Sequence, residues 1–324
     1  GRKCAILEAH YVAGGCAQGF RRKGYYFDAG AHLIGSSNQN SVLSRLLKSL
    51  DIEYKFVDVF PMDRIHFPDR TINIPQGWST YRDQLCFNYP NDIKAIGDLF
   101  DQIEYIAKYA AKKQIAQKYA DITFQEMLNK HLENIELKRV LGSQWGFLGE
   151  PPQKVSALAM SIMLISYIRD GARYPKGGAQ RFCNVLANKF RSLGGKIFLS
   201  TPVIAVDVQN SKIVSLRAPN HRVFSADYFI STINPEYLCD LLNKDVQNEI
   251  NQVWHRTILG TQKSISLYAI YLGLNLAPNK LFGLNGWHYP DWNIEHREAW
   301  TYVFSPTLYD ESLAPIGKST LEAA

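Results

Sequence analysis

The chain has 324 residues, of which 46% are hydrophobic and 12% aromatic, so a disordered protein is excluded and about two folded domains are expected. The formal net charge is +6 and the lysines and arginines are spread without a long run, so no nucleic-acid partner is expected. Weak attraction to anionic lipid, and with it peripheral membrane association, stays open.

The first 35 residues carry the clearest pattern. Residues 4–7 form a short apolar run that ends at Glu8, as expected of a buried parallel strand whose last residue turns toward a ligand. An acid at such a strand end accepts hydrogen bonds from ribose hydroxyls in dinucleotide-binding folds. At Gly14 and Gly15 the backbone can approach a pyrophosphate closely. A polar connection over residues 17–23 and a strand over residues 25–28 are expected next.

The middle of the chain is predominantly helical. The spacing predicts a helix over residues 42–50, capped by Ser41, and then short strands between residues 55 and 75. Several helices follow between residues 91 and 168. This block of some eighty residues is too large for a loop, so we expect an inserted cap over a ligand site. Its apolar run over residues 155–168 is shorter than the roughly 20 residues that span a bilayer, which favours a buried helix over one dipping into a membrane surface.

After residue 176 the pattern alternates between helix and strand. We expect a helix with its apolar face over residues 182–193, a strand at 196–199 and a meander of three short strands over residues 204–225. Residues 228–230 are predicted to re-enter the parallel sheet, and Pro235 to start a helix. Residues 263–272 and 299–304 are expected to form strands of an antiparallel sheet.

Three segments in fixed order carry a resemblance: residues 7–15, residues 24–30, and residues 174–178, which read Tyr-Pro-Lys-Gly-Gly. Together they resemble the phytoene desaturase, carotenoid isomerase and retinol saturase family of FAD-dependent oxidoreductases. A further segment, residues 305–317, is similar to that family's Ser-Pro…Asp-x-Ser-Leu-Ala-Pro-x-Gly loop. The resemblance extends over the whole chain.

The resemblance implies contacts with FAD. Glu8 would hold the ribose, the paired glycines would pass the pyrophosphate, and the backbone of Val203 would lie against the adenine. The complete set of residues expected to bind FAD is Glu8, Gly14, Gly15, Gly30, Ala31, Val203 and Ser231. The residues expected on the substrate side are Tyr174, Gly177 and Gly178.

His32 is the ionisable residue nearest the expected flavin edge, so it is our candidate catalytic residue, able to position substrate or move a proton. The alternative is a structural histidine that only makes hydrogen bonds. No His/Cys cluster has metal-ligand spacing, so no metal site is expected.

The expected fold is α/β, with a Rossmann-type FAD-binding domain interleaved with an antiparallel-sheet substrate domain capped by helices. The FAD-binding domain would comprise residues 1–60 and 176–240, and the substrate domain residues 61–175 and 241–324. Relative to the family, the chain starts after the first strand and its G-x-G-x-x-G turn and stops before the last flavin segment. We therefore expect it to be the middle of a longer protein.

The expected function is desaturation, saturation or cis–trans isomerisation of a long, hydrophobic polyene such as a carotenoid or retinoid. One alternative is an FAD-dependent amine oxidase of the same fold. Another is a non-enzymatic prenyl- or lipid-binding protein of the GDP-dissociation-inhibitor type.

Five cysteines far apart, without a C-x-x-C pair, indicate a reducing compartment. We therefore expect the protein in the cytoplasm or on the cytoplasmic face of a membrane, with a plastid as an alternative.

Overall fold

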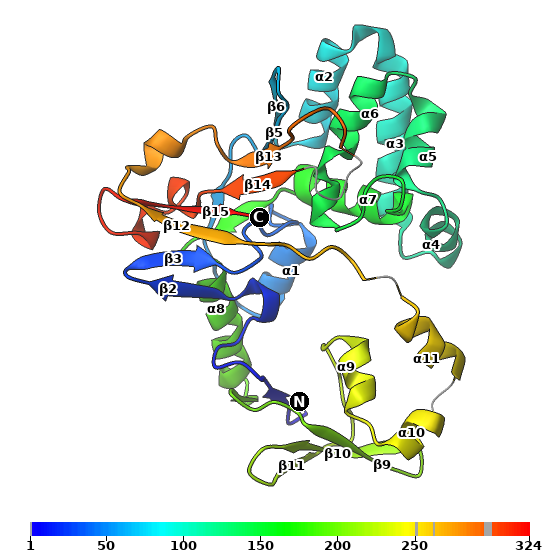
Figure 1. Ribbon diagram of the computed structural model, residues 1–324, viewed down its shortest axis with the longest axis vertical. Helices are drawn as coiled ribbons and strands as arrows, with labels where there is room; N and C mark the ends of the chain where they lie inside the picture. Colours follow the sequence, from blue (N-terminus) through cyan, green and yellow to red (C-terminus); the bar gives the residue numbers. More distant parts are fainter. Residues whose placement is uncertain (1, 250–251, 262, 295–299) are drawn as a thin grey trace. The chain divides into compact units, whose positions relative to one another are not determined.

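The computed structural model describes residues 2–249, 252–261, 263–294 and 300–324 (Figure 1). The chain folds into two compact units, and each is discontinuous in sequence. The first unit contains Gly1–Gly15 and Cys183–Lys263, and the second contains Cys16–Phe182 and Ser264–Ala324. Residues 16–60, which the sequence placed with the FAD-binding domain, thus pack within the second unit. The boundaries of the functional domains stay a prediction.

The first unit is built on a parallel pair and a meander. Strand β1 (Ala5–Leu7) pairs in parallel with β8 (Lys196–Phe198). The meander consists of β9 (Ala205–Gln209), β10 (Lys212–Ala218) and β11 (Arg222–Ser225), all antiparallel. Both of its turns have two successive residues with positive φ, which matches the twist of hairpin strands. The part of α8 (Ala179–Ser192) from Cys183 onward also lies in this unit, together with α9 (Pro235–Asp240), α10 (Lys244–Glu249) and α11 (Gln252–Leu259).

The strand expected over residues 228–230 does not form. The side chains of Tyr228 and Ile230 are 70% and 93% exposed. Within the described part of the chain, β1 and β8 pair only with each other. An apolar run with high strand propensity becomes a strand only where a neighbouring strand takes its backbone hydrogen bonds, so propensity alone misled the prediction here.

A six-stranded mixed sheet forms the centre of the second unit. Its strand order is β12-β15-β14-β13-β5-β6, and every neighbouring pair is antiparallel except β13 with β5. The strands are β12 (Ile270–Leu274), β15 (Ser319–Ala323), β14 (Thr301–Phe304), β13 (Gly286–His288), β5 (Asp63–His66) and β6 (Thr71–Ile74). The strand predicted over residues 263–272 is therefore shifted, because β15 pairs only with residues 270–274.

Two small antiparallel pairs accompany this sheet. Strand β2 (Gly19–Arg22) pairs with β3 (Tyr25–Asp28), and β4 (Phe56–Asp58) pairs with β7 (Arg173–Pro175). Residues 17–23 were expected to be only a connection. They contain β2 instead, because Lys23 and Gly24 both have positive φ and form the tight turn that joins it to β3.

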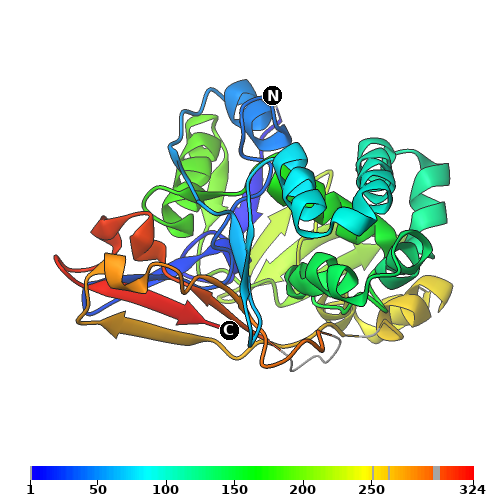
Figure 2. The ribbon, with the colours of Figure 1, turned by 90° about the horizontal axis from the view of Figure 1, so that it is seen from above.

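The helices of the second unit gather beyond the β5–β6 end of the six-stranded sheet in both views (Figures 1 and 2). α3 buries one stripe of apolar side chains, and in α7 Met160 and Leu164 are buried, as expected of a core helix. No helix among the described residues is long and apolar enough to cross a bilayer. The helices are α1 (Val42–Ser49, outside this group), α2 (Trp78–Asn88), α3 (Ile93–Tyr109), α4 (Lys113–Ala120), α5 (Phe124–His131), α6 (Ile135–Gly142) and α7 (Ala157–Leu164), which continues as a π-helix over Ile165–Arg169.

Two glycines leave room for the buried ring of Tyr26 in β3. A Cβ atom on Gly19 would lie 2.1 Å from the Tyr26 hydroxyl oxygen, and one on Gly178 would lie 2.3 Å from the ring carbons. Gly178 also has a φ of +88°, which disfavours any other residue. It immediately precedes α8 (Ala179–Ser192), so the space for Tyr26 and the start of this helix depend on the same residue.

We expect Gly178→Ala to destabilise the second unit. The left-handed backbone costs a Cβ-bearing residue about 1–2 kcal/mol, and overpacking against Tyr26 adds about 1–3 kcal/mol. Gly283→Ala is the matched control, because Gly283 has a φ of +97° and no atom within 4 Å of the added Cβ. Urea unfolding of both variants measures the difference. Equal losses would show that Tyr26 is not confined by Gly178.

Candidate functional site

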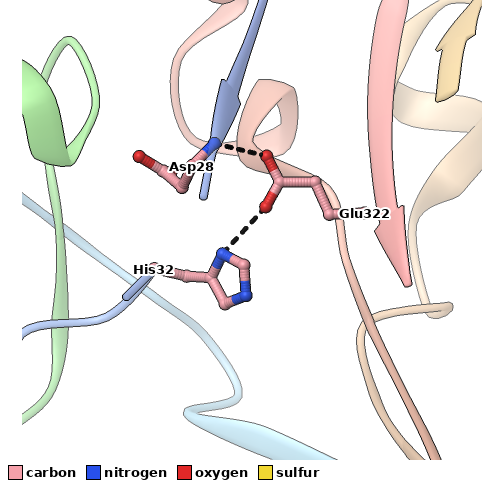
Figure 3. A group of neighbouring side chains, drawn as sticks. All are labelled: Asp28, His32 and Glu322. Atoms are coloured by element: carbon pink, nitrogen blue, oxygen red, sulfur yellow. Dashed lines mark hydrogen bonds and ion pairs between the residues drawn. The ribbon is translucent and has the colours of Figure 1, made fainter. Parts of the chain in front are cut away.

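The candidate site lies where β3 ends, in the second unit. Asp28 is the last residue of β3 and is completely buried. Its backbone N–H donates a 2.7 Å hydrogen bond to Oε1 of Glu322 in β15, and Oε2 of Glu322 lies 2.8 Å from Nδ1 of His32 (Figure 3). The three residues therefore form one network that joins the two ends of the sequence.

The carboxylate of Asp28 is held by three donors. Oδ1 accepts from the Tyr26 hydroxyl at 2.7 Å and from the Ala179 backbone N–H at 2.9 Å, and Oδ2 accepts from the Tyr174 hydroxyl at 2.8 Å. Ala179 is the first residue of α8, and a helix N-terminus favours negative charge. Burial raises the pKa of Asp28, against the charge of His32 and these hydrogen bonds. The acid at the β3 end is therefore enclosed rather than open to solvent.

His32 lies against aromatic rings. Its ring centroid is 4.8 Å from that of Phe304 and 6.0 Å from that of Tyr302, both nearly parallel to it. Burial alone would lower the pKa of His32, but the hydrogen bond and charge of Glu322, together with the charge of Asp28, raise it above its ordinary value. Burial raises the pKa of Glu322, as it does that of Asp28. Nε2 of His32 points away from both acids (Figure 3).

The nitrogen and oxygen atoms of Asp28, His32 and Glu322 lie within 4.8 Å of one another, close enough for a metal ion. Both oxygens of Asp28 are already hydrogen-bonded, and Glu322 is shared between His32 and a backbone N–H. The contacts are those of a hydrogen-bonded network with one cation for two acids. The role of this network in a reaction stays a prediction.

The residues expected on the substrate side occupy the same region. Tyr174 is buried with its hydroxyl on Asp28, and the Gly177 N–H donates to Oδ2 of Asp310 at 2.8 Å. Asp310 also pairs with Lys176 at 2.8 Å, which links the Tyr-Pro-Lys-Gly-Gly segment to the loop that follows β14. These contacts show how the segment is anchored, and its role toward substrate stays a prediction.

The residues expected to bind FAD are divided between the units. In the first unit Glu8 follows β1, its N–H donates to the Phe198 carbonyl at 2.9 Å, and its own carbonyl accepts from the Thr201 N–H at 2.8 Å, two residues before Val203. One carboxylate oxygen of Glu8 accepts from the His10 N–H at 2.8 Å. Ser231 is exposed and outside any strand. In the second unit Gly30 and Ala31 lie beside Cys16, whose carbonyl oxygen accepts from the Ala31 N–H.

The geometry of the first unit fits a nucleotide. Gly14 and Gly15 have φ values of +137° and +54°, and nothing lies within 4 Å of a Cβ built on Gly15. A carboxylate at the carboxyl end of a parallel strand and open glycine backbone are the features that take ribose and phosphate in nucleotide-binding folds. The FAD contacts themselves stay a prediction.

Two functional candidates were missed from the sequence. Glu322 completes the network with His32. Asp63 is a second buried acid, whose Oδ2 accepts from the Trp287 indole N–H at 2.7 Å and the Gln144 amide at 2.9 Å. Burial raises the pKa of Asp63 to about 6, although the hydrogen bonds oppose this. No local pattern around either acid signals burial, because their partners are far away in the sequence.

Comparison with known proteins shows related sequences along most of the chain. Residues 1–268 match the family described as flavin containing amine oxidoreductase. An all-trans-retinol 13,14-reductase of Danio rerio is 26% identical over 351 aligned residues, covering 91% of this chain and 54% of the relative. A chloroplastic prolycopene isomerase 1 of an Oncidium hybrid cultivar is 21% identical, covering 98% and 59%. A lycopene-forming phytoene desaturase of Pseudescherichia vulneris is 21% identical, covering 96% and 69%.

Solved structures show the same fold. An oxidoreductase from Methanosarcina mazei aligns with a TM-score of 0.71 at 18% identity, covering 99% of this chain and 72% of that one. A putrescine oxidase aligns with a TM-score of 0.63 at 16% identity, covering 98% and 69%. The expected α/β fold and the resemblance to polyene-acting flavoproteins are thereby confirmed. The chain spans little more than half the length of the first two relatives.

We expect the stability of the second unit to depend on pH through Asp63. The folded protein binds this proton more tightly than the unfolded chain, whose aspartate has a pKa near 3.8, so protonation favours folding. Relative to Asp63→Asn, the wild-type free energy of unfolding should fall by about 3 kcal/mol as the pH rises from about 4 to beyond 6. Urea unfolding followed by tryptophan fluorescence measures this, with the exposed Asp83→Asn as control. A difference that does not vary with pH would contradict the argument.

Proposed function

Because this chain belongs to the flavin-containing amine oxidoreductase family, we propose that it is part of an FAD-dependent oxidoreductase acting on carbon–carbon bonds of a long polyene, a carotenoid or a retinoid. The observation that carries the proposal is the pairing of His32 Nδ1 with the buried carboxylate of Glu322 at 2.8 Å, beside the ring of Phe304 and with Asp28 as the other charged member of the network. The names of the retinol reductase, prolycopene isomerase and phytoene desaturase relatives support the substrate class.

We assign the nucleotide part of FAD to the first unit. Glu8 would accept the ribose hydroxyls, the open backbone at Gly14 and Gly15 would lie along the pyrophosphate, and the backbone at Val203 would contact the adenine. Gly30 and Ala31, which follow β3, and Ser231 belong to the same proposed set. The positions of Glu8 and of the backbone before Val203, joined through Thr201, support this assignment.

The chemistry requires a proton as well as a hydride. FAD, when bound, would supply hydride transfer to or from one carbon of the reacting carbon–carbon bond. The adjacent carbon must gain a proton in saturation and lose one in desaturation, and we assign this proton to Nε2 of His32. Glu322 and the Asp28 charge favour the protonated ring, while Phe304 and Tyr302 keep its face in apolar surroundings. In isomerisation no net hydride or proton would be consumed.

A polyene would need an elongated apolar cavity, since its binding energy comes from buried hydrocarbon at about 25 cal/mol per Å². We propose that the helices between residues 91 and 168 and the sheet containing β12 line this cavity. Tyr174, Gly177 and Gly178 would position the substrate side of the site through their contacts with Asp28, Asp310 and Tyr26. The location stays a proposal, either the cytoplasm or the cytoplasmic face of a membrane, or a plastid, and the names of several relatives as chloroplastic support the plastid.

An amine oxidase is the second candidate. The family description and the fold shared with putrescine oxidase favour it, and two buried acids could attract a protonated amine. A non-enzymatic lipid-binding protein would retain the fold without needing flavin. Bound FAD distinguishes both enzymes from the binding protein, and the product distinguishes the enzymes from each other: a change in polyene absorbance, or release of aldehyde from an amine.

We expect Glu8→Gln to weaken FAD binding. Replacing a carboxylate by an amide removes charge-assisted hydrogen bonds worth about 1.5–3 kcal/mol, which corresponds to a loss of roughly tenfold to a hundredfold in affinity. Titration of the apoprotein with FAD, followed by flavin fluorescence, measures the dissociation constant. Asp227→Asn, an exposed acid of the same unit, is the control. Equal affinities for wild type and Glu8→Gln would exclude Glu8 from the site.

We expect His32→Gln to lower polyene turnover by about a hundredfold or more while FAD stays bound, because a positioned acid–base group contributes roughly that much.

In Glu322→Gln, polyene saturation should stop at a lower pH than in the wild type, since the charge that raises the pKa of His32 is removed. The exposed His221→Gln should leave both unchanged. Full polyene turnover by His32→Gln would overturn the assignment of the proton. Turnover of amines alone would replace the polyene proposal with the amine oxidase.

A further inference from the structure

One end of the six-stranded sheet collects three segments, which we call the loop end: residues 19–24, which are β2 and its turn, and the loops 275–285 and 311–318. The pairing of Leu274 with Ser319 places the second and third segments at the same end of β12 and β15, and the Ser319 hydroxyl donates to the Leu276 carbonyl at 2.7 Å. A Cβ on Gly24 would lie 3.3 Å from Pro315, which brings in the first segment. Both ribbon views show these segments together (Figures 1 and 2).

Bulky apolar side chains project from the loop end. Ile316 is fully exposed at a turn closed by the Lys318 N–H on the Pro315 carbonyl at 2.9 Å. Phe282 is 71% exposed, and Leu276 and Leu284 are also exposed. These four side chains come from two separate loops at the same end of the sheet, and we treat them as one apolar patch, since such patches mark interaction surfaces.

Positive charge accompanies this patch. The three segments contain five cations and one acid, Glu311; the cations are Arg21, Arg22, Lys23, Lys280 and Lys318. Among the residues that the structure describes, none of the five forms an ion pair with an acid. Arg21 instead lies 5.5 Å from the ring centroid of Tyr26. The charges therefore remain available to an anionic partner.

We propose that the loop end binds the surface of an anionic lipid bilayer. Ile316 and Phe282 would enter the boundary between headgroups and acyl chains, and the surrounding lysines and arginines would contact the negatively charged headgroups. Apolar side chains at loop tips with cations around them are complementary to a lipid interface, which is apolar inside and anionic outside. The surface is independent of the FAD and polyene assignments, so either proposal can fail without the other.

The test is co-sedimentation of the full chain with vesicles of phosphatidylcholine alone or mixed with phosphatidylserine. We expect binding to the mixed vesicles, weakened by high salt. The double variant Phe282→Ser/Ile316→Ser should lose about tenfold or more in binding. Phe87→Ser/Ile135→Ser is the matched control, because these side chains are 85% and 62% exposed on helices of the same unit. Circular dichroism shows whether each variant is folded.

A second double variant, which removes two lysines, separates the electrostatic contribution to vesicle binding from the apolar one. Lys23→Gln/Lys280→Gln should weaken binding to the mixed vesicles without changing binding to phosphatidylcholine alone, and the exposed Lys113→Gln/Lys130→Gln should bind as the wild type does. Absence of wild-type binding to either vesicle, or equal binding by the loop-end variants and their controls, would overturn the proposal. Self-association of the wild type that the Phe282/Ile316 variant abolishes, without vesicle binding, would identify a second copy of the chain as the occupant instead.

Discussion

The second unit depends on one buried carboxylate, Glu322, which satisfies two donors from the opposite end of the sequence. It accepts the Asp28 backbone N–H and holds the His32 ring, so β15 is tied to the end of β3. A buried carboxylate is costly unless it is paired, and here its two oxygens are each used by a different partner. The same contacts that tie β15 to the end of β3 also orient the His32 ring and raise its pKa. A change at Glu322 therefore alters both the packing of β15 and the environment of His32.

Aromatic residues lie beside Asp63 and beside His32, the partner of Glu322, and burial raises the pKa of both Asp63 and Glu322. Trp287 donates to Asp63 and also packs against Trp300 and Tyr302, whose ring in turn lies near His32. Aromatic rings exclude water, and only Trp and Tyr among them can donate a hydrogen bond. Few groups therefore stabilise the negative charge of a carboxylate in this region. Gain or loss of one proton at Asp63 or Glu322 therefore changes the free energy of folding. Protonation of an exposed carboxylate changes it little.

Much of the fold could be predicted from the sequence because its signals are local. Ser41 and Thr123 cap helices where the pattern indicates them, and the apolar stripe of α3 has helical spacing. The glycine pairs marked turns that the structure contains. Local signals failed where pairing decides the outcome: Arg21 and Arg22 look like a solvated connection yet lie in β2, and residues 228–230 look like a strand yet find no neighbour. His32 was found because it follows a motif, whereas Glu322 and Asp63 gain their importance only from residues hundreds or tens of positions away.

The discontinuity of the second unit has a consequence for how the chain acquires its structure. Asp28 and Glu322 are 294 residues apart, and between them the chain leaves the second unit to form most of the first. During synthesis β15 is made after β3 and after the intervening segments that form most of the first unit. Until β15 is made, the Asp28 N–H and the His32 ring have only water or temporary partners. Contacts so distant in sequence are slow to form, so this site can assemble only once β15 is in place.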